Sequence, residues 1–164
     1  MRILGLFSVI GVALAAPFLL STAQASAAAC KDVPTIIHSA DLANNTADGG
    51  HVKQHVLGET PPVGTSQAGK TLFADKAKYA AAWRQYTYYG TAQCAGGSEG
   101  KVANQTMTLD QLHMGHLDAY SCTAANPNGT CSAKTLYMAH SITYGFKFTG
   151  GKWILNTCYP IPAT

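Results

Sequence analysis

Charge is scarce in this sequence: 12% of its 164 residues are Asp, Glu, Lys or Arg, and the formal net charge is +3. This mild positive balance permits an anionic ligand, but it falls far short of the basic excess of a dedicated nucleic-acid coat protein. The chain also lacks internal repeats and low-complexity segments. Beyond residue 20 it has no long apolar run, so we expect the rest of the chain to be soluble.

The one long apolar run lies at the N-terminus. Arg2 precedes a nearly continuous apolar stretch, Ile3–Leu20, and small residues fill most of positions 21–29. This layout is typical of a secretory signal peptide, and Pro17 argues against a retained membrane anchor. Acceptable cleavage points follow Ala25, Ala27 and Ala29. We therefore predict a signal peptide over residues 1–29 and a secreted or periplasmic protein.

Removal of the signal peptide leaves 164 − 29 = 135 residues, which is enough for a single domain over residues 30–164. Arg2 is the only charge lost, so the balance becomes 10 basic minus 8 acidic residues, or +2. One compact domain of low net charge is therefore expected.

The five cysteines contain no Cys-x-x-Cys pair, the usual spacing of a zinc site. In an exported protein, disulfides are the expected alternative. Cys122 and Cys131 flank a turn-rich loop that a disulfide would close well, so we predict that these two pair. Cys94 would then pair with Cys158 and leave Cys30 single, although the sequence itself does not fix the connectivity.

The best helix in the sequence covers Ala74–Tyr89. Alanines dominate it, aromatic residues recur at helical spacing, Asp75 is placed to cap its start, and Gly90 follows its end. A short helix is expected around Ser39–Asn44. The segment Gly58–Gly69 contains two prolines and further glycines, which predicts a loop.

The second half of the chain predicts strands. Val, Ile, Thr and aromatic residues alternate there with polar ones, and Thr149-Gly150-Gly151 is a strong hairpin signal. The predicted strands are Lys101–Leu109, Leu117–Cys122, Thr135–His140, Ser141–Phe148 and Lys152–Tyr159. Helices followed by strands predict an α+β fold, with N-terminal helices packed on a curved antiparallel β-sheet.

Two histidines follow a glycine pair in the segment Gly49–Val56, which reads Gly-Gly-His-Val-Lys-Gln-His-Val. If this segment is helical, His51 and His55 lie on one face. Imidazoles titrate near neutrality and can transfer protons, and a helix start favours a bound phosphate. The spacing also fits a metal pair, although the Glu of a His-Glu-x-x-His motif is missing. One surface histidine and one packed histidine is the purely structural alternative.

Side-chain alternation along the last predicted strand places Thr157 and Tyr159 on one face and Cys158 on the other. A hydroxyl and a phenol would thus face a cleft together, although an ordinary half-buried strand has the same pattern. Two cations are candidates for a phosphate contact: Lys70 in a loop and Arg84 on the long helix. Each is equally compatible with a solvated surface residue.

Three pieces of this chain, taken in order, resemble a known family. They are the segment Gly49–Val56, then Gly69-Lys70-Thr71-Leu72-Phe73 before a helix with Trp83, and finally Thr157-Cys158-Tyr159-Pro160. This order is similar to that of the RNase A-like toxin domains of bacterial contact-dependent inhibition systems. Those domains belong to the wider BECR ribonuclease superfamily, whose members place α-helices before a curved antiparallel sheet. This sequence departs from them in its long Pro/Gly loop, its cysteines and its own signal peptide.

The resemblance implies that His51 is a catalytic histidine and that Thr157 and Tyr159 are active-site hydroxyls. His55 matches the second histidine of the family segment. The first candidate for the basic residue expected at the phosphate is Lys70.

Arg84 is the second candidate for that phosphate contact. The activity implied by the resemblance is an endoribonuclease that needs neither a metal nor another cofactor and cleaves single-stranded RNA. A toxin role would imply an immunity protein as a partner.

In that reaction, His51 would take the proton of a ribose 2′-hydroxyl, which attacks the adjacent phosphate and yields a 2′,3′-cyclic phosphate. His55 or Tyr159 would protonate the leaving 5′-oxygen, and Thr157 and Lys70 would hold the phosphate oxygens. Two other functions compete with this one. The first is a non-catalytic, disulfide-stabilised exported binding module. The second is a metal-dependent hydrolase that uses His51 and His55 together with a carboxylate or with a second histidine pair, His113 and His116.

Overall fold

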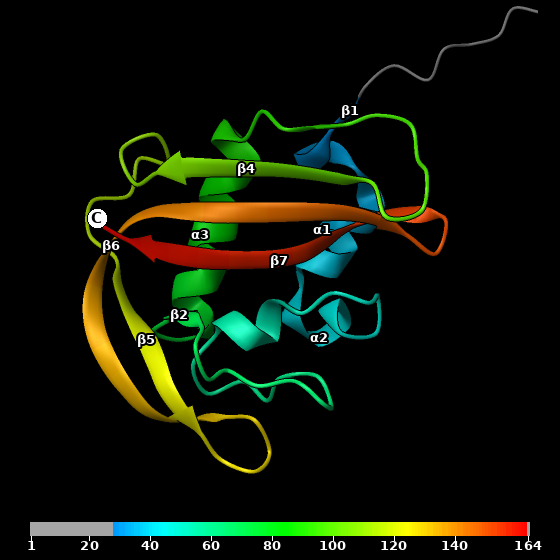
Figure 1. The fold of residues 1–164 in the computed structure, drawn as a ribbon. Coiled ribbons are helices and arrows are strands. Elements are labelled where there is room, and N and C mark those ends of the chain that lie inside the picture. The colour runs from blue at the N-terminus through cyan, green and yellow to red at the C-terminus, as the bar shows by residue number, and fades with distance from the viewer. Residues whose placement is uncertain (1–27, 164) are drawn as a thin grey trace, which may run out of the picture.

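The computed structural model describes residues 28–163, and it has the α+β architecture expected from the sequence (Figure 1). A five-stranded antiparallel sheet has the order β2-β5-β6-β4, and β7 also pairs with β6. A two-stranded sheet joins β1 (Ala28–Ala29) to β3 (Gln93–Cys94). All but the last two residues of the predicted signal peptide lie outside the described residues. Within the described part of the chain, no helix combines the length and the apolar character needed to cross a bilayer.

The helices precede most of the sheet along the chain. A 3-10 helix η1 (Cys30–Asp32) leads into α1 (Pro34–Ala40) and α2 (Leu42–Asn45), and a second 3-10 helix, η2, covers Val52–His55. The short helix expected near residues 39–44 is therefore two short helices with a break between them. The break comes at Asp41, whose extended backbone ends α1 and whose carboxylate accepts a hydrogen bond from the Ala43 N–H at the start of α2.

The helix α3 (Lys76–Tyr89) confirms the strongest helix prediction. The Asp75 carboxylate accepts a hydrogen bond from the Lys78 N–H at 2.8 Å and so caps the first turn. Gly90 leaves helical geometry with an extended backbone. A side chain at Gly90 would also collide with the Tyr86 ring, because a Cβ there would lie 2.4 Å from it.

The strands of the sheet are short at the start and long at the end. The shorter ones are β2 (Thr71–Phe73), β4 (Val102–Thr108) and β5 (Asp118–Ala125). The longer ones are β6 (Cys131–Thr149) and β7 (Lys152–Pro162), joined by the predicted hairpin at Gly150 and Gly151. The two strands expected over residues 135–148 are thus one continuous strand. The pairing of β6 with β7 shifts register between Ala139 and Ser141, which bends β6 there without ending it.

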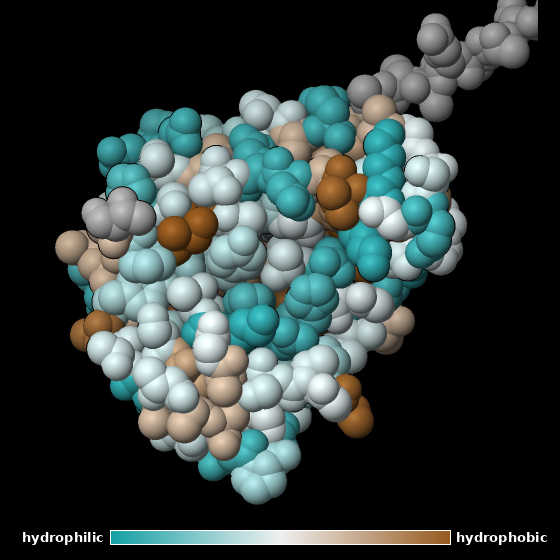
Figure 2. All heavy atoms as spheres, in the orientation of Figure 1, coloured by the Kyte–Doolittle hydropathy of each residue, from teal (hydrophilic) through white to brown (hydrophobic). Residues whose placement is uncertain are grey.

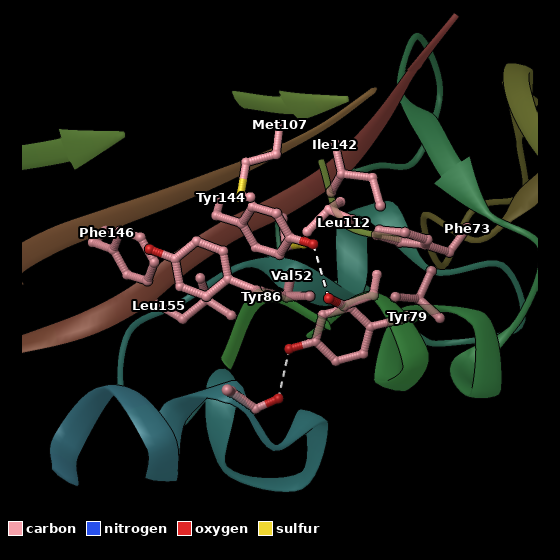
Figure 3. Close-up of a cluster of buried hydrophobic side chains, with 14 of the residues drawn as sticks. Val52, Phe73, Tyr79, Tyr86, Met107, Leu112, Ile142, Tyr144, Phe146 and Leu155 are labelled. Atoms are coloured by element: carbon pink, nitrogen blue, oxygen red, sulfur yellow. Dashed lines mark hydrogen bonds between the residues drawn. The ribbon is translucent and has the colours of Figure 1, made fainter. Parts of the chain in front are cut away.

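The core lies between α3 and one face of β4, β6 and β7 (Figure 3). Tyr86 and Tyr144 are fully buried with ring centroids 4.3 Å apart. The Tyr144 O–H donates to the Ala82 carbonyl at 2.8 Å, and the Tyr79 O–H donates to the Ala40 carbonyl at 2.5 Å. Burial of each such side chain contributes roughly 2–3 kcal/mol. These contacts tie α3 and α1 to the same face of the sheet.

The opposite face of β4, β6 and β7 is turned toward the viewer in Figure 1, and no helix crosses its central part. In Figure 2 this side of the molecule is coloured mainly white to teal, with only isolated brown residues. We call this surface the open face. We define it by seven of the residues that point outward from the three strands: Asn104, Thr106, Thr143, Gly145, Lys147, Thr157 and Tyr159.

The free edge of β7 is closed by hydrogen bonds from the N-terminal helices. The Thr35 hydroxyl donates to the Trp153 carbonyl at 2.6 Å, and the Ser39 hydroxyl accepts from the Leu155 N–H at 2.8 Å. The Asn45 amide donates to the Leu155 carbonyl at 2.8 Å. An exposed strand edge invites pairing with other chains, so these side chains protect β7 and dock the helices at once.

The disulfides confirm one predicted pair and correct the other. Cys122 pairs with Cys131 across the β5–β6 turn, as expected. Cys94, however, pairs with Cys30 and not with Cys158. The pairing of β1 with β3 brings Cys30 and Cys94 to a Cα separation of 4.9 Å, a contact between distant segments that the spacing along the chain could not reveal.

Cys158 is free and fully buried on the core face of β7, where it lies opposite Tyr144 in the register. Burial raises the pKa of its thiol well above the ordinary value. The thiol is therefore both inaccessible and protonated at neutral pH, which makes it unreactive toward the other cysteines in the folded state.

We expect alkylation to distinguish the two cysteine assignments. The folded, oxidised protein should take up no thiol label, and the protein unfolded without reductant should take up one, on Cys158. Peptide mapping by mass spectrometry after labelling is the measurement. A label found on Cys30 instead would restore the pairing of Cys94 with Cys158 and contradict this structure.

Candidate functional site

The buried side chain of Asn45 shapes the glycine turn ahead of the histidines. Its amide bonds three backbone groups, at 2.7–2.8 Å: the Ser39 carbonyl, the Leu155 carbonyl and the Val52 N–H. Gly50 packs directly on this amide, since a Cβ there would lie 2.5 Å from Asn45 Nδ2. Gly49 has a φ of +92°, which a residue with a side chain rarely adopts. Both glycines are therefore required where they stand.

A second buried amide holds the other end of the histidine segment. Gln67 is fully buried, and its Nε2 donates to three carbonyls at 2.8–3.1 Å, those of Lys53, Val56 and Glu59. Its Oε1 accepts from the Cys131 N–H at 2.9 Å. The loop predicted over residues 58–69 is thereby tied to η2 and to the Cys122–Cys131 turn, so η2 is fixed at both ends.

The histidine segment is a 3-10 helix rather than an α-helix. His51 flanks η2 with a φ of −135°, and His55 is its last residue. Because a 3-10 helix has three residues per turn, the two rings do not lie one above the other as α-helical spacing would place them. His51 is half-buried, whereas only 8% of His55 is exposed.

The His55 ring is held by two contacts. Its Nδ1 lies 2.9 Å from the Thr71 carbonyl and donates to it, since a carbonyl can only accept. Its ring stacks on Tyr159 with centroids 5.0 Å apart and an interplanar angle of 30°. Burial, with smaller contributions from Lys70 and His51, lowers the pKa of His55 to about 4, even though the Thr71 carbonyl favours the charged form. The ring is therefore neutral at pH 7.

An extra residue in β7 sets the direction of Thr157 and Tyr159. Gly145 of β6 pairs with Thr157 and Phe146 with Leu155, so Asn156 between them has no partner of its own. This β-bulge reverses the alternation of the strand: Leu155 faces the core, and so does Cys158, three residues later. The Asn156 carbonyl accepts a hydrogen bond from the His51 N–H at 2.8 Å, which places the bulge against the histidine segment.

Two lysines lie close enough to His51 to influence its charge. Burial lowers the pKa of His51, and the charges of Lys70 and Lys147 lower it further. Neither lysine forms an ion pair with any described carboxylate. Lys70 was predicted, but Lys147 was not. The outward direction of Lys147 could have been predicted from the sequence. Tyr144, Phe146 and Phe148 alternate along the strand and face the core, so Lys147 between them faces the other side.

Arg84 lies apart from this cluster, so the structure does not bring it together with the other residues predicted at a phosphate. It is exposed on α3, a helix whose Ala82 carbonyl receives the Tyr144 hydroxyl. The core face of the sheet therefore lies toward α3, while Thr157 and Tyr159 point to the open face. A helical pattern places a residue on a helix but does not tell which face of a sheet that helix covers.

The Thr157 hydroxyl oxygen is buried and has no hydrogen-bond partner among residues 28–163. Its methyl group leans over Gly145, where a Cβ would come within 2.7 Å of it. A buried hydroxyl without a partner costs about 1–3 kcal/mol, so it calls for an explanation. A rotation of about 120° around χ1 would bring the hydroxyl to the position over Gly145 that the methyl group now holds, on the open face.

The cluster is partly buried, since only 8% of His55 is exposed and the Thr157 hydroxyl oxygen is enclosed. Three surface pockets of about 270, 260 and 630 Å³ are lined by other residues. Among residues 28–163, no group of three or more His, Cys, Asp or Glu side chains is arranged to hold a metal ion. The arrangement brings together two neutral imidazoles, a phenol, a hydroxyl and two cations along one side of a sheet.

No protein-family model, no curated protein and no solved structure matches this chain. The likeness to the RNase A-like toxin domains therefore rests on the short segments named above, and the function has to be inferred from the geometry.

The low pKa of His55 makes the folded state sensitive to acid. The unfolded chain binds a proton at His55 near the ordinary pKa of 6.5, whereas the folded chain does so only near 4. The free energy of unfolding should thus be greatest above pH 6.5 and fall, by roughly 3 kcal/mol from this group, as the pH drops to about 4. NMR titration of the imidazole signals and denaturant unfolding across this range measure both effects. A His55 signal that titrates at 6.5 or above would contradict the buried, neutral ring.

Proposed function

We propose that this protein is an exported endoribonuclease that cleaves single-stranded RNA without a metal ion. The observation that carries the proposal is the meeting of His51, the stacked pair His55–Tyr159, Lys70 and Thr157 on one open face. The two histidines are more than 100 residues away from Thr157 and Tyr159 in the sequence. A base, a proton donor and a cation around one point are the groups that attack by a ribose 2′-hydroxyl on its own phosphate requires.

His51 is the general base of the proposed reaction. It is the more exposed of the two neutral rings, and the charges of Lys70 and Lys147 favour its unprotonated form. It takes the proton of the 2′-hydroxyl while the 2′-oxygen forms a bond to phosphorus. The bond from phosphorus to the 5′-oxygen breaks, which leaves a 2′,3′-cyclic phosphate on one fragment and a 5′-hydroxyl on the other.

Tyr159 is the donor to the leaving 5′-oxygen. His55 was the alternative donor, but a ring with a pKa of about 4 carries no spare proton at pH 7. A phenol does carry one. His55 instead positions Tyr159 through the stacked rings, and its own orientation is fixed by the Thr71 carbonyl. Solvent returns the proton from His51 to Tyr159 between turnovers.

The charge that develops on the phosphate is met by Lys70, Lys147 and the Thr157 hydroxyl. Both lysines lie near His51 and have no carboxylate partner among the described residues. The unpartnered Thr157 hydroxyl gains a partner when it turns toward a phosphate oxygen. Donors that find their acceptor only in the complex contribute to its stability without competing with a bond inside the protein.

Export fits the rest of the chain. Two disulfides are typical of proteins that work in an oxidising compartment, and the N-terminal residues have the layout of a signal peptide. Single-stranded RNA fits an open surface, because a polymer can lie across a sheet without entering a pocket. An inhibitor protein made by the same cell becomes necessary only if the enzyme acts in a cytosol.

Incubation of the purified, oxidised protein with labelled single-stranded RNA tests the proposal. Cleavage should persist in EDTA, produce 2′,3′-cyclic phosphate ends and spare DNA of the same sequence. His51→Ala should lower the rate by about 10²–10⁴, the usual contribution of a general base. Because the pKa of His51 is lowered, the acid limb of the rate profile should have its midpoint below pH 6.5.

Three other outcomes would contradict the proposal. Cleavage that stops in EDTA and resumes with zinc would indicate a metal-dependent hydrolase. A folded protein that binds RNA without cutting it would be a binding module. His51→Ala protein that cuts like the parent would remove the proposed base.

Three lysine and arginine variants test which cations serve the phosphate. Lys70→Ala and Lys147→Ala should each lower kcat/KM by about 10–100-fold, because each removes a positive charge beside His51, where negative charge develops on the phosphate. Arg84→Ala is the matched control and should retain parental activity, since Arg84 is exposed on the far side of the sheet. Steady-state kinetics on one short RNA measures all three. Equal losses in all variants would indicate a general effect of net charge instead of a local site.

A further inference from the structure

The open face carries two rows of side chains that run across the three strands. One row is Asn104, Gly145 and Thr157, and the next is Thr106, Thr143 and Tyr159. Residues directly opposite one another on neighbouring strands share a face. Since neighbouring strands are about 4.8 Å apart, Asn104 on β4 lies roughly 10 Å across the face from Thr157 on β7. The reactive groups thus stand at the β7 side, and the β4 side is left for another part of a substrate.

Gly145 lies buried at the centre of the first row. It has no side chain of its own, and a Cβ there would come within 2.7 Å of the Thr157 methyl and 3.2 Å of Asn104 Oδ1. The side chains on both sides therefore lean over the glycine. A planar ring placed over these side chains would have its edge against the Asn104 amide.

The hydrogen-bonding groups of the two rows differ in availability. In the second row, the Thr106 and Thr143 hydroxyls bond each other at 2.7 Å. The Asn104 amide is exposed and makes no hydrogen bond with another described residue. It therefore offers a donor and an acceptor side by side, the pair that an amide uses to read the edge of a base.

We propose that Asn104 determines base specificity by hydrogen bonding to the edge of the base whose ribose and phosphate lie at His51. This inference rests on the proposed function, and it adds where the base lies and which residue reads it. Lys70 and Lys147 hold the phosphate on the β7 side, while the side chains of the first row, which close over Gly145, form the surface under the base. Single-stranded RNA is the form that can splay a base onto such a surface.

The test compares wild type, Asn104→Ala and Asn104→Asp in the cleavage of a single-stranded RNA pool of random sequence, with the cut sites read by sequencing. Wild type should favour some bases at the cut site, and Asn104→Ala should reduce that preference by about fivefold to a hundredfold while cutting continues. Asn104→Asp, which has no donor, should shift the preference toward bases that present an N–H group. Gln93→Ala, which removes an exposed amide on the small β1–β3 sheet, is the control and should keep the wild-type preference.

Binding of non-cleavable 2′-O-methyl homopolymers of the four bases separates this inference from the ribonuclease proposal. Base-dependent affinity that Asn104→Ala abolishes supports the base site even if no RNA is cut, in which case only the catalytic proposal fails. Cleavage with the same base preference in wild type and Asn104→Ala overturns the base site and leaves catalysis standing. Wild type without base preference in either assay overturns it as well.

Discussion

Two buried amides control this structure. Asn45 and Gln67 are both fully buried, and between them they make seven hydrogen bonds to main-chain groups of the helices, the histidine segment, β7 and the disulfide-closed turn. A buried backbone group left without a partner costs about 1–3 kcal/mol. The irregular segment that carries His51 and His55 has few hydrogen bonds between its own backbone groups. The two amides therefore supply hydrogen bonds that a regular helix or strand would have made within its own backbone.

The electrostatics of the site follow from that placement. Because η2 is pressed against β7 and the Lys70 loop, His55 is buried on Tyr159 and both histidines lie near lysines. Burial and nearby positive charge both favour the neutral ring. In the proposed reaction, His51 and Tyr159 would transfer the protons, and Lys70 and Lys147 would stabilise the negative charge on the phosphate.

Parts of this arrangement were readable from the sequence. The alanines and the capping Asp75 predicted the helix α3. Gly150 and Gly151 predicted the final hairpin, and the alternation around Cys158 predicted which side of β7 faces outward. These are local signals. The pairing of Cys30 with Cys94 and the position of Arg84 depend on which distant segments meet, and no short-range pattern records that. The outward direction of Lys147 could be predicted from the alternation along β6, but only after its neighbours had been assigned to the core. The sequence did not predict the hydrogen bonds that Asn45 and Gln67 make to the main chain, because an amide that will be buried cannot be distinguished in the sequence from an exposed one.

The bulge at Asn156 decides which way the end of β7 faces. If the strand were straightened with Asn156 retained, regular alternation would turn the hydroxyl of Thr157 and the phenol of Tyr159 into the aromatic core and expose the Cys158 thiol. Deletion of Asn156 would be milder, because it removes the extra residue and leaves every other residue of the strand on its present side. When this chain is aligned with one that has no bulge, a one-residue gap at this point keeps the two faces of the strand matched, whereas an alignment without the gap would match outward residues to residues of the core.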